Sequence, residues 1–236
     1  MLARTLLGTR LAAAIVIACG LAACGDSETT QRKTFIEFLQ TRIVAKPGIH
    51  VPKLTAEETA AFGPYAAHYA VIADFNGHLD QSVSKPLQQA LAAGAPRSLA
   101  EVAARRQDIA AVGAGLGQIH TALDREVASA DAARAALKQP DDLKPVFAAA
   151  YDRDVTQPAK AWAEIFPDVD AAMKSILALA DFLDQHRDKI TVSGSMLQVA
   201  DPSLQPRLQA LVDALRAKQE AIQKAQQRLH DLAYGS

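Results

Sequence analysis

The stretch SLAEVAARRQDIAAVGAGLGQIHTALDREVASADAARAALK, residues 98–138, decides the fold class of this chain. Apolar side chains recur along it at every seventh position, namely at Val102, Ile109, Leu116, Leu123, Ala130 and Leu137. Because seven residues are close to two helical turns, these side chains share one helix face. The spacing predicts one long helix over 98–138, packed inside an antiparallel bundle. Arg105 and Glu126 interrupt the stripe, so a coiled-coil dimer is the second interpretation and not the first.

The rest of the chain is also helical in pattern. Only 5% of its residues are aromatic and alanine is abundant, a composition that favours helices over strands. Thr55 and Glu58 have the spacing of a capping box, which marks the start of a helix. Further helices are expected over 28–45, from Thr55 to about Pro86, from Pro140, over 168–187 and from Asp201 onward. Breaks or kinks are expected at Gly63-Pro64, Lys85-Pro86, Pro158 and Pro167, because proline has no amide hydrogen to donate.

One stretch predicts strands. β-Branched and apolar residues at 190–192 and 196–199 flank Ser193-Gly194-Ser195, a typical hairpin turn. An isolated hairpin is only marginally stable, so we expect it to pack on the helices. The predicted class is therefore all-α: an elongated antiparallel helical bundle of roughly four to five long helices with one short β-hairpin near 190–199.

The N-terminus has the parts of a bacterial secretion signal. Arg4 and Arg10 make a positive start, and residues 11–21 form an apolar run that is shorter than the roughly 20 residues needed to span a bilayer. The run ends in Leu21-Ala22-Ala23-Cys24, which looks like the lipobox of a lipoprotein signal peptide. A plain secretory signal with an incidental cysteine and a short transmembrane anchor are the alternatives.

The lipobox interpretation divides the chain into three parts. We expect residues 1–23 to be removed as a signal peptide, residues 24–30 to form a tether acylated at Cys24, and residues 31–236 to form the helical domain. Removal of 1–23 also removes Cys19, so the mature chain has no pair of cysteines for a disulfide. Its formal net charge changes from −1 to −3, which gives no electrostatic basis for binding nucleic acid or anionic lipid. We expect the acyl chains to hold the protein at the periplasmic side of the inner or the outer membrane.

Sequence motifs for catalysis or metal binding are absent. There is no G-x-S-x-G and no H-E-x-x-H. Asp74 and His78 are four residues apart, a spacing that metal ligands share with ordinary surface pairs. We therefore expect no enzymatic activity, no cofactor and no metal.

Trp162 and Phe166 are four residues apart and share a helix face. The first interpretation is core packing near the prolines. The second is an anchor for a partner protein, because tryptophan is enriched at interface hot spots.

Three segments carry a family resemblance. They are QRKTFIEFLQ at 31–40, the stretch from Leu54 to Ala70 with FGPY at 62–65, and ALKQPDDLKPVF at 136–147. Together they resemble an uncharacterised family of Gram-negative lipoproteins, the YiaF-like proteins, which carry a domain of unknown function. The resemblance implies a lipid-anchored, largely helical envelope protein and brings no catalytic residues.

The third segment is a tight helical corner containing Asp141 and Asp142. It is either the joint that sets two helices antiparallel, which we favour, or a contact surface for a partner. For the whole chain, the leading hypothesis is a non-catalytic accessory protein that binds another envelope component. A carrier for a lipid or other apolar ligand is the alternative, and an unrecognised hydrolase is the third.

Overall fold

The stripe at 98–138 forms two helices instead of the single one that its spacing predicts. The computed structural model describes residues 20–94, 98–193 and 196–235. In it, α5 (Leu99–Ala104) and α6 (Arg106–Ala136) meet at Arg105, whose φ of −115° and ψ of 28° are not helical. The chain bends there because the stripe serves two cores. Val102 packs in a small core with Leu183, whereas Ile109 and the later stripe residues pack in the main core.

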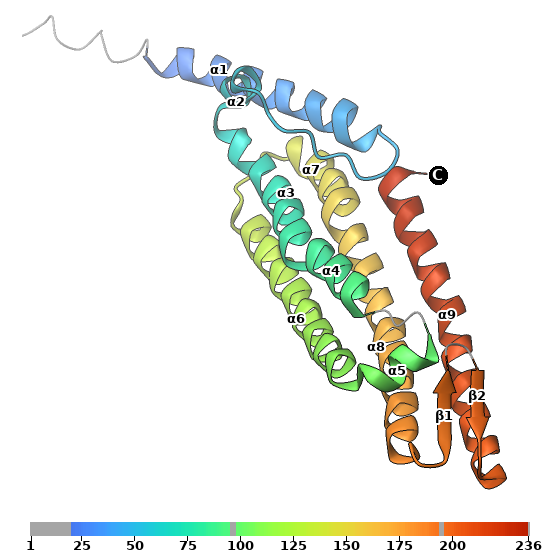
Figure 1. Ribbon diagram of the computed structural model, residues 1–236. Helices are drawn as coiled ribbons and strands as arrows, with labels where there is room; N and C mark the ends of the chain where they lie inside the picture. Colours follow the sequence, from blue (N-terminus) through green and yellow to red (C-terminus); the bar gives the residue numbers. More distant parts are fainter. Residues whose placement is uncertain (1–19, 95–97, 194–195, 236) are drawn as a thin grey trace, which may run out of the picture.

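The remaining helices lie along α6 as an elongated bundle (Figure 1). In chain order the other helices are α1 (Gly20–Leu39), α2 (Ala56–Phe62), α3 (Ala66–Leu79), α4 (Lys85–Gly94), α7 (Leu143–Tyr151), α8 (Gln157–Gln185) and α9 (Gln205–Tyr234), with short 3₁₀ turns η2 (Gly63–Tyr65) and η5 (Pro202–Leu204). α6 runs opposite to α4 and α8, α9 runs opposite to α8, and α1 crosses the end opposite the hairpin. The all-α class is confirmed, and the stripe of α6 is buried within its own chain, as the bundle interpretation requires.

Two predicted breaks, at Lys85-Pro86 and at Pro158, are preceded by π turns in continuous helices, and a third π turn lies at the end of α1. η1 (Gln40–Val44) extends α1, η3 (Asp80–Ser84) joins α3 to α4 just before Pro86, and η4 (Asp152–Thr156) joins α7 to α8 just before Pro158. A π turn shifts the backbone hydrogen bond by one residue, so it absorbs a missing proline amide without ending the helix. The break expected at Pro167 is wrong, because that residue lies inside α8.

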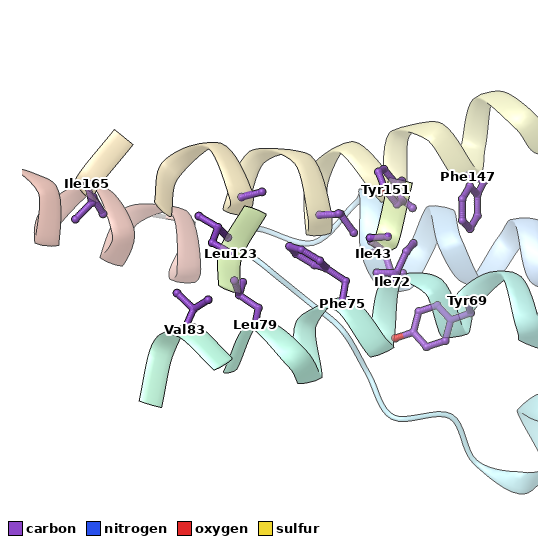
Figure 2. Packing of buried hydrophobic residues seen from close by; sticks show 14 of the residues in the cluster. Ile43, Tyr69, Ile72, Phe75, Leu79, Val83, Leu123, Phe147, Tyr151 and Ile165 are labelled. Atoms are coloured by element: carbon purple, nitrogen blue, oxygen red, sulfur yellow. The ribbon is translucent and has the colours of Figure 1, made fainter. Parts of the chain in front are cut away.

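The main core is filled by aromatic and aliphatic side chains from α1, α3, α6, α7 and α8 (Figure 2). Phe75, Leu79 and Val83 project from α3 and η3 toward Leu123 of α6. The capping box is present at the start of α2: the Glu58 amide donates to Thr55 Oγ1 at 3.1 Å, and the Thr55 amide donates to Glu58 Oε2 at 2.8 Å.

The predicted hairpin is confirmed. β1 (Ile190–Ser193) pairs with β2 (Met196–Val199) in antiparallel register, with Ile190 opposite Val199. Ile190 is buried in the small core with residues of α5, α8 and α9, so the hairpin packs on the bundle as expected.

Candidate functional site

The connector at residues 49–54, between η1 and α2, is held to the bundle by side chains. The Tyr69 hydroxyl donates a hydrogen bond of 2.6 Å to the Pro52 carbonyl. The His50 amide donates to Asp154 Oδ1 at 3.3 Å. Because the connector forms neither helix nor strand, these bonds from distant elements give it a fixed position.

The carboxyl group of Asp154 is fully buried and only partly hydrogen-bonded. Asp154 is 0% exposed, and its Oδ2 has no hydrogen-bond partner among the described residues. Burial raises the pKa of this carboxyl to about 6, and the His50 amide and the Arg153 guanidinium oppose that rise only in part. Burial and then the nearby Asp154 charge raise the pKa of Tyr69 above its ordinary value. Below a pH of about 6 the Asp154 carboxylate, which accepts the hydrogen bond from the His50 amide of the connector, therefore becomes protonated.

The backbone of Asp154 explains why a π turn occurs there. In an α-helix its carbonyl would accept from the residue four positions later, but that residue is Pro158, which has no amide hydrogen. Asn76 of α3 supplies the missing donor, and its Nδ2 lies 2.9 Å from the Asp154 carbonyl oxygen. Asp154 thus joins η4, α3 and the connector at one point.

A cleft of about 540 Å³ lies between the connector and α3, next to this point. Residues 51–54 line one side and residues of α3 line the other, and most of the lining is apolar. The polar lining side chains are those of Lys53, Thr59, Tyr69, Asp74 and Asn76. No hydrogen bond joins any two of these side chains in the part of the chain that the structure describes.

Asp74 lines the cleft, whereas His78 is not among the lining residues. His78 Nδ1 instead lies 3.2 Å from Glu126 Oε2 of α6. Within residues 20–94, 98–193 and 196–235, no group of three or more His, Cys, Asp or Glu side chains could hold a metal ion.

The corner before α7 is tied to α1. Arg32 Nε donates to Asp142 Oδ2 at 3.1 Å, and Arg32 Nη1 also bonds Glu28 Oε1 at 2.9 Å. Asp141 points to solvent, with its side chain 98% exposed, and pairs with Lys144, which lowers the pKa of that carboxyl. Of the two acids, Asp142 therefore has the contact expected of a joint.

The structure also places the aromatic pair of α8. Phe166 is buried, with its ring stacked on His120 at 4.6 Å between centroids. Trp162 is partly buried against the main core. This packing matches the first interpretation of the pair, and contact with a partner stays a prediction.

The lipobox residues Leu21, Ala22, Ala23 and Cys24 lie in the first turns of α1. Residues 1–19 of the predicted signal peptide are outside the described residues, and residues 24–30, predicted as a tether, are helical. None of the helices in the described residues is long and apolar enough to cross a membrane.

Sequence reasoning missed Asp154 and Tyr69. The available signal was the proline four positions after Asp154, which leaves a helical carbonyl without a donor. Nothing in the sequence pointed to Asn76 as the group that supplies it, because 78 positions separate the two residues.

Comparison with known proteins finds one family. A family model described as a protein of unknown function, DUF3053, matches residues 12–230. The uncharacterized protein YiaF of Escherichia coli K12 is 28% identical over 214 residues, which cover 90% of this chain and 90% of the relative. The proteins of the same name from Escherichia coli O157:H7 and Shigella flexneri match to the same extent. No solved structure matches the chain.

Proposed function

Because this chain belongs to the DUF3053 family, whose function is unknown, we propose a function from its own residues: a lipid-anchored protein of the bacterial cell envelope. Its helical body binds another envelope component and catalyses no reaction. The observation that carries the proposal is Leu21-Ala22-Ala23-Cys24 at the end of a short apolar run. The resemblance to YiaF-like proteins, made on three separate segments, holds over most of the chain.

The arrangement behind Cys24 supports a binding role. The most deeply buried carboxyl described above, that of Asp154, bonds to a connector amide and has no solvent contact, so its geometry suits holding the connector. The connector in turn forms one wall of an open cleft. A fixed scaffold with an open, mostly apolar cleft is suited to recognising a partner or ligand.

Metabolic labelling with an alkyne analogue of palmitate tests the anchor. We expect the wild-type protein to be labelled and recovered with membranes, and Cys24→Ser to be unlabelled and to keep its signal peptide. Cys19→Ser is the matched control, since it changes a cysteine in the segment that is removed, and it should behave as wild type. Labelling of Cys24→Ser, or an unlabelled wild type, would overturn the proposal.

A photo-crosslinking amino acid at an exposed position tests the binding role. Placed at Asp74 in the cleft, it should yield a discrete crosslinked species in intact cells, while the same residue at exposed Lys174 of α8 should not. Absence of a species specific to the cleft position would count against recognition there.

The cleft also favours a second candidate, a carrier for an apolar ligand. Its volume of about 540 Å³ falls within the roughly 300–1,000 Å³ typical of small-ligand sites. Native mass spectrometry of the detergent-purified protein should then show a bound lipid or other small molecule. Only the unliganded mass in repeated preparations would contradict the carrier.

A further inference from the structure

We infer that one end of the bundle rests on the headgroup layer of the membrane, an inference that depends on the lipidation of Cys24 proposed above. This end is formed by the first turns of α1 and by the corner at residues 138–144. We refer to Lys33, Lys138, Asp141 and Lys144 as the membrane-facing set. All four side chains are exposed.

The chain between the anchor and the bundle is too short to hold the two apart. Glu28 is bound to the body, because the Tyr65 hydroxyl donates a hydrogen bond to its carboxylate. Four residue steps separate it from Cys24. These steps span about 6 Å in the helical form of α1 and at most roughly 14 Å if fully extended. The start of the bundle therefore stays within that distance of the acylated residue.

The corner is bound to the same turn of α1. Arg32 bonds to Asp142 at 3.1 Å, and the helical rise puts Arg32 about 12 Å from Cys24. The hairpin is at the other end of the bundle (Figure 1). α8, with its 29 residues, separates the two ends by about 43 Å.

The chemistry of the membrane-facing set matches a zwitterionic headgroup layer. It combines three lysines with Asp141, whose side chain is 98% exposed and pairs with Lys144; the neighbouring Asp142 is bound to Arg32. Lysines can meet lipid phosphates, and carboxylates can meet the ammonium of phosphatidylethanolamine. Since both signs are present, the contact should depend little on ionic strength, unlike attraction of a polybasic segment to anionic lipid.

Short-range fluorescence quenching tests the inference on the full lipidated protein. Asp141→Cys and, as the matched control at the far end, Met196→Cys each receive one thiol-reactive fluorophore. Labelling is specific because acylated Cys24 has no free thiol. The proteins are placed in vesicles of phosphatidylethanolamine and phosphatidylglycerol that contain a lipid with a nitroxide on its headgroup.

We expect quenching at position 141 to exceed that at position 196 several-fold, with little change at high salt. Equal quenching, or stronger quenching at 196, in a protein whose N-terminal acylation is verified by mass would overturn this inference alone. An unacylated N-terminus would overturn the proposed anchor and this inference with it. Loss of the difference at high salt would contradict the zwitterionic contact.

Discussion

Replacing Asp154 by asparagine should stabilise the protein at neutral pH. The carboxyl is fully buried, and its pKa of about 6 lies above the ordinary value of 3.8. Between these two values the folded state keeps a proton that the unfolded state has released. The free energy of unfolding of the wild type therefore falls as pH rises from about 4 to about 6, and the loss is complete above that range. The separation of the two pKa values corresponds to about 3 kcal/mol, an upper limit on the effect.

Asparagine resembles the protonated acid, since its carbonyl oxygen can still accept from the His50 amide. Urea unfolding, followed by circular dichroism from about pH 4 to about pH 7.5, measures the effect, because this range contains the interval in which the stability falls. Asp154→Asn should equal or exceed the wild type at neutral pH and lose the pH dependence of this group. Asp152→Asn is the control, because that side chain is exposed in the same π turn and should leave the pH dependence unchanged.

Two results would refute this reasoning. One is a wild type whose stability does not fall between pH 4 and pH 6 relative to Asp154→Asn. The other is an asparagine variant that is less stable than the wild type at neutral pH by several kcal/mol, which would mean that the carboxylate is ionised and well compensated in the folded state.

Other substitutions test separate contacts, all by the free energy of unfolding in urea. Tyr69→Phe removes the hydroxyl that donates to the connector and should cost about 1 kcal/mol; no change would mean that this bond does not hold the connector. Asp142→Ala breaks the pair with Arg32 and should cost up to about 1 kcal/mol, whereas Asp141→Ala should be neutral. A double Asp141/Asp142 variant that melts normally but loses partner capture would contradict the joint interpretation of the corner. Pro167→Ala restores an amide inside α8 and should stabilise the protein by about 1 kcal/mol or more; a destabilised variant would show that the proline is required there.

The local features of the fold could be predicted because they depend on residues close together in the chain. The capping box at Thr55 and Glu58 formed as its spacing indicated. The hairpin formed where β-branched residues flank a Ser-Gly-Ser turn. The seven-residue stripe correctly marked the buried side of α6. The same local rules failed at Pro167, because packing of α8 along its whole length outweighs the missing amide.

The sequence by itself determined the helical class, the hairpin, the capped helix start at Thr55 and the candidate lipidation signal, since each is encoded within a few turns of chain. Only the tertiary structure decided the bend at Arg105 and the burial of Asp154. The bend depends on two cores that draw on opposite ends of one stripe. The bonds that define the Asp154 site come from residues 104 and 78 positions away. Burial raises the pKa of this carboxyl because distant elements exclude water from it. The residues next to Asp154 in the sequence do not indicate that burial.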